Sequence, residues 1–240
     1  MIFWKMLLAH FVTDFVLQPD ALTENKGKLK VLLIHCLIFF ILATLSLLPV
    51  FSYRSVTALG LLSAFHGIID YLKDVLQRRK GRDFWPYFVG DQALHLLGIG
   101  VVFLFLRETG YPWIVETVHR YWLNPSLFMV SAFFVSIIFG GSYFIGIVCK
   151  GFLDPLDIKR RPGIERAGRY LGMIERSLIL TAVLIGKIEF VGYIFAAKSI
   201  ARYPEMKEES HFAEYYLVGT LTSISLAFFG GLLLKHFLGW

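Results

Sequence analysis

Charge is scarce in this chain: Lys, Arg, Asp and Glu together make up 18% of its 240 residues, against about 25% in an ordinary soluble domain. Hydrophobic residues reach 56% and the mean hydropathy is +0.63. The scarcity excludes an ordinary soluble fold, because too little polar surface is left to face water. Runs at 31–51, 93–106 and 127–149 contain almost no charge, and a bilayer-spanning helix needs roughly 20 such residues. The composition predicts an all-α, polytopic membrane protein.

Cysteine is also rare. Cys36 and Cys149 are the two in the sequence, and both lie inside apolar runs. This excludes a disulfide framework, and neither residue has the paired spacing of a zinc ribbon. The net charge of +6 comes from basic residues that cluster between the apolar runs. Such clustering is typical of loops beside anionic lipid, so we expect the bilayer and no nucleic acid as a partner.

The apolar runs divide the chain into membrane segments. No small-residue cleavage site follows the first run, so we expect a retained helix there. The seventh apolar run, at 189–203, is short and carries Lys198 and Arg202, which indicates a re-entrant or tilted segment. Residues 108–124 are typical of an interfacial connector with aromatic anchors, between a half at 1–107 and a half at 125–240. We expect eight segments, at 2–18, 30–50, 55–77, 86–106, 126–150, 167–187, 189–203 and 211–237.

The loop charges predict an orientation. Most basic residues outside the runs fall in alternate connections, at 19–29, 78–85, 151–166 and 204–210. The connections between them are nearly neutral. The positive-inside rule therefore places these four loops in the cytoplasm and both termini outside.

The first half contains three His–Asp pairs with a spacing of four residues. Residues four apart share one face of a helix. The first and third segments have His before Asp, whereas the oppositely directed fourth has Asp before His. Every Asp is therefore expected nearer the cytoplasm, with its His one turn deeper. The pairs are His10 and Asp14, His66 and Asp70, and Asp91 and His95, and the unpaired His35 falls in the same layer.

These residues predict a metal site. An Asp at the bilayer centre costs about 2.5–3.5 kcal/mol, so the carboxylates must face one another, water, a cation or a substrate. Imidazole nitrogen and carboxylate oxygen suit a divalent ion, with zinc first and manganese or iron as alternatives. Two other interpretations stay open: a proton or substrate relay, and ordinary hydrogen bonds between helices. The expected metal ligands are His10, His35, His66, His95, Asp70 and Asp91, and the expected catalytic carboxylates are Asp14, Asp70 and Asp91.

A second set of charges lies in the C-terminal half. Three cations there are suited to binding the phosphate or carboxylate of a head group, with two carboxylates to balance them. The alternative is that the long basic side chains extend to the membrane interface. The expected head-group residues are Arg176, Lys198, Arg202, Glu175 and Glu214.

Several motifs resemble a family of bacterial integral membrane proteins catalogued as DUF3307. They are Leu8-Ala9-His10-Phe11-Val12-Thr13-Asp14-Phe15-Val16-Leu17-Gln18 with Glu24-Asn25-Lys26, His66-Gly67-Ile68-Ile69-Asp70, Asp91-Gln92-Ala93-Leu94-His95, Ile174-Glu175-Arg176, Ala196-Ala197-Lys198-Ser199-Ile200-Ala201-Arg202 and Glu214-Tyr215-Tyr216-Leu217-Val218-Gly219-Thr220-Leu221. The resemblance implies a bacterial inner-membrane location. It implies no activity, because the family is one of unknown function.

Three functions fit these observations. The first is a metal-dependent intramembrane hydrolase, in which the ion activates a water and a remaining aspartate acts as base. Its substrate would be a lipid, a lipid-linked intermediate or a membrane-proximal group. The second is a proton- or cation-coupled transporter that uses the same His/Asp cluster. The third is an accessory membrane protein whose polar layer only fixes helix packing.

Overall fold

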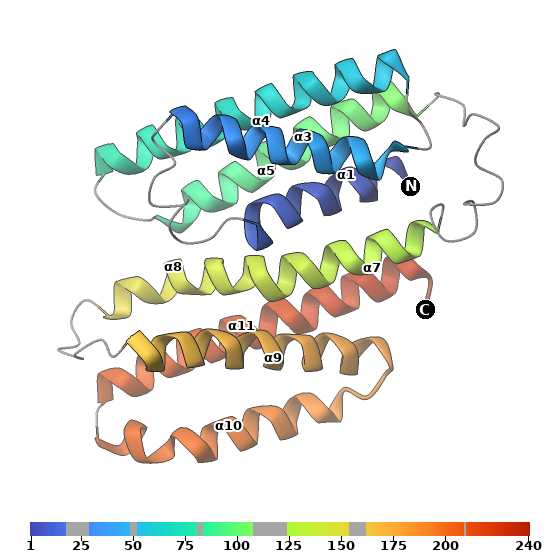
Figure 1. The fold of residues 1–240 in the computed structure, drawn as a ribbon. Helices are drawn as coiled ribbons and strands as arrows, with labels where there is room; N and C mark the ends of the chain where they lie inside the picture. Colours follow the sequence, from blue (N-terminus) through green and yellow to red (C-terminus); the bar gives the residue numbers. More distant parts are fainter. Residues whose placement is uncertain (18–28, 49–51, 81–83, 108–123, 154–161, 209) are drawn as a thin grey trace. The chain divides into compact units, whose positions relative to one another are not determined.

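A computed structural model describes residues 1–17, 29–48, 52–80, 84–107, 124–153, 162–208 and 210–240. Every element in these ranges is helical, which confirms the all-α class predicted from composition. The chain forms two compact units, Met1–Val135 and Ser136–Trp240 (Figure 1). The connector expected at 108–124 lies, apart from Asn124, outside the described residues.

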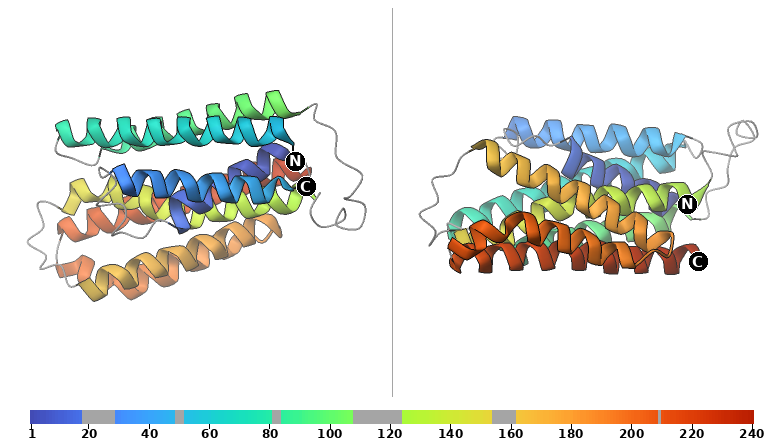
Figure 2. Two further views of the ribbon diagram at one scale, coloured as in Figure 1. Left: turned by 45° about the horizontal axis from the view of Figure 1, so that its top comes forward. Right: turned by 90° about the horizontal axis from the view of Figure 1, so that it is seen from below.

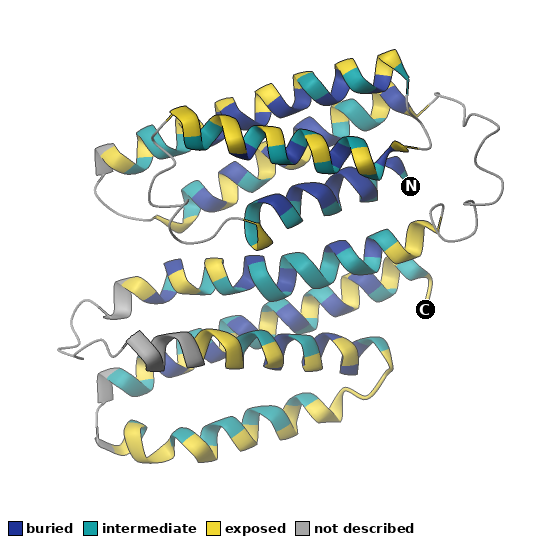
Figure 3. Cartoon of the chain, viewed as in Figure 1, coloured by how far each residue is buried: buried dark blue, intermediate teal, exposed yellow. Residues whose placement is uncertain are grey.

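In the first unit, α4 packs against both α3 and α5, and α1 contacts α3, α5 and α7. Figure 2 shows α3, α4 and α5 running side by side. The apolar core lies where α1 meets its neighbours, and α1 is the most continuously buried helix of the unit (Figure 3). The elements are α1 (Ile2–Phe11), the π-helix η1 (Val12–Val16), α3 (Leu29–Ser46), α4 (Tyr53–Lys80), α5 (Trp85–Leu106) and α7 (Pro125–Val135).

Local sequence sets the helix starts in this unit. At the start of α4, Ser52 and Ser55 cap each other: the Ser55 amide donates to Ser52 Oγ at 3.1 Å, and the Ser52 amide donates to Ser55 Oγ at 2.8 Å. This reciprocal arrangement satisfies backbone donors that a helix start leaves without partners. Pro86 lies in the first turn of α5, where its missing N–H costs nothing.

In the second unit, α11 packs against α8 and α9, and α10 contacts both α9 and α11. Gly186 ends α9 with φ of +73°, a conformation that glycine adopts without steric cost. The next amide, that of Lys187, donates back to the Ala182 carbonyl at 2.8 Å, which closes the helix end. The elements are the π-helix η4 (Ser136–Gly140), α8 (Gly141–Leu153), α9 (Pro162–Leu184), α10 (Glu189–Glu208) and α11 (Ser210–Leu238).

Within the described residues, five helical stretches are long and apolar enough to cross a membrane, which indicates a membrane protein. They are Leu29–Ser46, Tyr53–Arg78, Trp85–Leu106, Pro125–Lys150 and Phe212–Leu238. The other expected segments correspond to α1 with η1, to α9 and to α10, none of which meets the same criteria. The count of eight segments, and the re-entrant nature of the seventh, therefore stay predictions.

Candidate metal centre

Four parts of the first unit bring the His/Asp residues into one buried cluster. His10 is on α1 and Asp14 on the π-helix η1, His35 is on α3, and α4 and α5 supply the other two pairs. The imidazoles of His10 and His66 are 0% and 1% exposed. Polar atoms of these side chains lie 2.9–3.7 Å apart, both within each His–Asp pair and between His35 and the pairs on neighbouring helices. The seven side chains that sequence spacing singled out thus meet at one place.

Small side chains let α3 and α4 come close at this cluster. A Cβ added at Gly67 would overlap Cys36 Sγ, so glycine is needed where the two helices touch. Ser63 Oγ donates to the Cys36 carbonyl at 2.7 Å across the same contact. Since His35 and His66 adjoin these residues in sequence, their rings are held against each other, with centroids 5.0 Å apart.

Four donor atoms lie close together at the centre of the cluster. The Nε2 atoms of His35 and His66 are 2.9 Å apart. His35 Nε2 lies 3.2 Å from both Asp14 Oδ1 and Asp70 Oδ2. His66 Nε2 lies 3.4 Å from Asp14 Oδ1 and 3.6 Å from Asp70 Oδ2. Ligands at ordinary bond lengths around a tetrahedral zinc ion are roughly 3.3–3.6 Å apart. The five separations given above, 2.9–3.6 Å, are therefore close to the distances between ligands of a zinc ion.

The charge of this donor set also suits a divalent cation. Asp14 and Asp70 carry two negative charges into a buried site, where unpaired charge is costly. One divalent ion would neutralise both. The donors also lie on separate elements, η1, α3 and α4, so that a bound ion would hold these elements together.

The imidazoles of His10 and His95 lie beside this central set of donor atoms. The ring centroids of His10 and His66 are 5.3 Å apart, those of His10 and His95 are 4.7 Å apart, and those of His66 and His95 are 4.3 Å apart. The paired histidines thus lie next to one another, and their common depth in the membrane stays a prediction. His35 departs from this pattern, because its Nε2 lies between the carboxylates of Asp14 and Asp70.

Hydrogen bonds assign the tautomers of two of these histidines. The Gln92 amide nitrogen donates to Asp91 Oδ2 at 3.1 Å, which directs Gln92 Oε1 toward His10. His10 Nε2 must then carry the proton and donate to that oxygen at 3.3 Å, so His10 Nδ1 has the lone pair. In the same way, His95 Nδ1 donates to the Asp91 carbonyl at 2.9 Å, which leaves the lone pair on His95 Nε2. Both lone-pair nitrogens are buried and make no hydrogen bond within the described residues.

Sequence reasoning missed two polar residues of the cluster. Lys73 Nζ donates to Asp91 Oδ2 at 2.8 Å, and Gln92 connects Asp91 to His10. Each had a signal in the sequence: Lys73 lies three residues after Asp70, hence on a similar face of α4, and Gln92 adjoins Asp91. Both side chains lie beside the atoms that could hold a metal ion.

The charged residues of the second unit are arranged differently. Buried Arg176 donates to the Ile138 carbonyl at 2.8 Å, to Ser223 Oγ at 3.1 Å and to Ser142 Oγ. Ile138 belongs to the π-helix η4, where the irregular turn frees a carbonyl for such a bond. These contacts give Arg176 a role in joining η4, α8, α9 and α11. The assignment of Arg176 to a head group stays a prediction.

The other expected head-group residues are more accessible. Lys198 Nζ donates to Glu175 Oε2 at 2.6 Å, between α10 and α9. Arg202 lies one turn later on α10 and contacts Glu205 at 3.2 Å. Glu214, near the start of α11, is exposed. Two cations of the predicted set thus lie on one helix, each beside a carboxylate.

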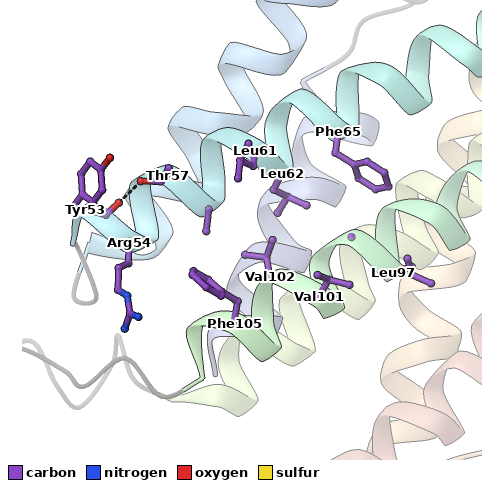
Figure 4. Close-up of a pocket in the computed structure, with 12 residues that line it drawn as sticks. Tyr53, Arg54, Thr57, Leu61, Leu62, Phe65, Leu97, Val101, Val102 and Phe105 are labelled. Carbon is purple, nitrogen blue, oxygen red and sulfur yellow. Dashed lines mark hydrogen bonds between the residues drawn. The ribbon is translucent and has the colours of Figure 1, made fainter.

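A groove of about 640 Å³ runs between α4 and α5 in the first unit (Figure 4). Its polar residues are Tyr53, Arg54 and Thr57 at one end, and apolar side chains from Leu61 to Phe105 line the rest. None of the His/Asp residues faces it. The groove therefore offers apolar surface, but no group for chemistry along most of its length.

The model of a family described as "Protein of unknown function (DUF3307)" matches residues 2–123, the stretch that carries all seven His/Asp residues. No curated protein and no solved structure matches the chain.

Proposed function

The chain belongs to the DUF3307 family, and because that family's function is unknown we propose one from the site itself: a metal-dependent hydrolase within a bacterial inner membrane. The ion, zinc before manganese or iron, is held by His35, His66, Asp14 and Asp70. The single observation that carries the proposal is the close approach of their four donor atoms, with five separations of 2.9–3.6 Å.

The chemistry that such an ion supplies is a bound water with a pKa lowered toward neutrality. His10 is suited to take the proton of that water, because its Nδ1 has the lone pair and lies 3.7 Å from Asp14 Oδ2. The water oxygen then bonds to the electrophilic centre of the substrate, and the bond to the leaving group breaks. The proton on His10 passes to the leaving group, which restores the neutral imidazole.

The substrate in this proposal is a lipid, a lipid-linked intermediate or another membrane-proximal group. Apolar helices that surround the cluster support this, since a substrate reaches the site from the bilayer or its interface. The count of eight membrane segments belongs to the same proposal, with α1, α9 and α10 added to the five apolar stretches. Within the second unit, Lys198 and Arg202 are each partly exposed, and their positive charges suit an anionic head group.

A second candidate function is a cation-coupled transporter, and one observation favours it. The candidate ligand set contains four protein atoms, whereas catalytic zinc sites usually have three protein ligands and a water. A site without an open coordination position suits an ion that is bound and then transported. Hydrolysis at this ion would require a fifth ligand, as some catalytic zinc sites acquire in the transition state.

Two measurements on the purified protein test these functions. Elemental analysis should find bound metal in the wild type and less than a tenth as much in His66→Gln. Wild-type protein loaded with zinc should then cleave p-nitrophenyl phosphate or p-nitrophenyl acetate, and His66→Gln should not. Metal without cleavage, together with zinc uptake into proteoliposomes, would favour the transporter. A metal-free wild type would contradict both functions.

A further inference from the structure

Asp70 takes part in two groups of metal-ligating atoms. One group joins Asp70 to His35 and His66, and the other joins it to Asp91 and His95. In each group the donor atoms all lie within 4.8 Å of one another. A carboxylate has two oxygens, so one residue can bind two ions at once.

We propose that a second divalent ion binds between Asp70, Asp91 and His95, so that Asp70 bridges a two-metal centre. This inference rests on the proposed metal-dependent function and adds to it a second site and a substrate class. Two-metal sites, with ions roughly 3.5–4 Å apart, occur in phosphatases, nucleases and aminopeptidases.

His95 and Asp91 each direct a donor atom toward the second position. His95 Nε2 has the lone pair, because Nδ1 donates to the Asp91 carbonyl. That nitrogen and Asp91 Oδ1 are both buried and make no hydrogen bond within the described residues. Lys73 and Gln92 bind the other oxygen of Asp91 and so fix its orientation. Contacts of this kind hold ligands in place around natural metal sites.

The second ion would have a coordination position open to water, which the first ion lacks. The first ion would have four protein donors, while Asp70, Asp91 and His95 would give the second ion three. Three protein ligands leave the fourth position for water, as in catalytic zinc sites. His10 stacks on His95, with centroids 4.7 Å apart, so that it could act as the base for such a water.

The charge of the full centre identifies the substrate class. Two divalent ions outweigh the charge of Asp14, Asp70 and Asp91 by one, and Lys73 adds another positive charge beside Asp91. A surplus of this size fits a phosphate ester, whose charge is matched by two metals and an ammonium. The water oxygen would bond to phosphorus, the bond from phosphorus to the leaving oxygen would break, and the proton taken by His10 would pass to that oxygen.

Metal stoichiometry tests the second site. The protein is purified in detergent, loaded with Mn²⁺, dialysed and analysed for metal per chain. We expect two ions in the wild type and one in both Asp91→Asn and His95→Gln. Asp74→Asn is the matched control, because Asp74 lies one turn after Asp70 on α4 and pairs with Arg78 outside the cluster; it should bind two ions.

Electron paramagnetic resonance of the wild type tests the bridge and needs no variant to fold. Two Mn²⁺ ions joined by Asp70 should give an exchange-coupled spectrum, and inorganic phosphate should alter it. One ion in both wild type and Asp91→Asn, or two uncoupled ions, would overturn the inference while the one-metal function stands. A coupled pair insensitive to phosphate would overturn the substrate class. A wild type without metal would instead contradict the proposed function.

Discussion

The Nε2 atoms of His35 and His66 lie 2.9 Å apart, although 31 residues separate the two histidines in the sequence. Two protonated nitrogens cannot approach so closely, so at most one of them carries a proton. Between the carboxylates of Asp14 and Asp70, the pair either shares one proton or directs two lone pairs at a cation. The same geometry thus supports a metal site and a proton relay, and variants of the acidic residues distinguish them.

Asp70→Asn should remove bound metal and leave the fold intact. The amide keeps the shape of the carboxylate but lacks the charge that offsets the cation. Metal content, thermal unfolding and hydrolysis are measured together, with Asp74→Asn as control. A proton relay predicts a different result, in which transport loses its pH dependence and metal content is unchanged. A fully active, metal-free Asp70→Asn protein would end the hydrolase hypothesis.

Gly67→Ala should destabilise the first unit and weaken metal binding together. The added methyl would overlap Cys36 Sγ and push α3 away from α4, which moves His35 away from His66. Overpacking of this kind costs about 1–3 kcal/mol. Thermal unfolding and zinc affinity are the measurements.

Two further variants give the Gly67→Ala experiment its controls. At Gly60, on the same helix, the nearest atom to an added Cβ is 3.9 Å away, so Gly60→Ala should be neutral or stabilising. Cys36→Ala in the Gly67→Ala background should restore both stability and affinity, because it removes the overlapping sulfur. A Gly67→Ala protein as stable as wild type would show that the two helices do not need this contact.

The sequence predicted the cluster because helix periodicity acts within each segment. A spacing of four residues places His10 with Asp14, and His66 with Asp70, on one face. The high cost of a carboxylate in lipid then requires these faces to meet. Both arguments use only local sequence and the properties of the bilayer, and neither needs the packing of one helix against another.

The donor set within the cluster could not be predicted in this way. His35 has no aspartate four residues away, yet of the four histidines it lies nearest to the carboxylates, because Gly67 and Cys36 set the distance between α3 and α4. The π-helix η1, which carries Asp14, likewise depends on tertiary packing. The contacts of Arg176 could not be predicted either, because no local pattern indicated that its guanidinium would donate to Ile138 and Ser223.

Gln92→Leu should impair catalysis more than the fold. Without the amide, His10 loses the hydrogen bond that fixes its tautomer, and Asp91 loses one of its two donors. Loss of such an outer contact typically lowers metal affinity or activity about 10- to 100-fold. Hydrolysis of p-nitrophenyl phosphate and Mn²⁺ affinity are measured, with Gln77→Leu on α4 as control. Unchanged values for both would remove Gln92 from the site.

Arg176→Gln should lower the stability of the second unit and leave metal content unchanged. The Ile138 carbonyl and the Ser223 hydroxyl would lose a buried donor, which costs about 1–3 kcal/mol. Arg169→Gln, at an exposed position of the same helix, is the control and should have little effect. Wild-type stability combined with weaker binding of anionic lipid vesicles would favour the head-group role instead.

The orientation in the membrane is tested by labelling a single cysteine in the 78–85 loop. Both native cysteines are first replaced, as Cys36→Ala and Cys149→Ala, and Gly81→Cys is introduced. The basic residues around this loop predict a cytoplasmic location, so a membrane-impermeant maleimide should react in inside-out vesicles and not in intact cells. Thr109→Cys, in a connection of nearly neutral charge, should react in intact cells and serves as the reverse control. Labelling of Gly81→Cys from outside would invert the orientation and place the Asp layer nearer the outer face.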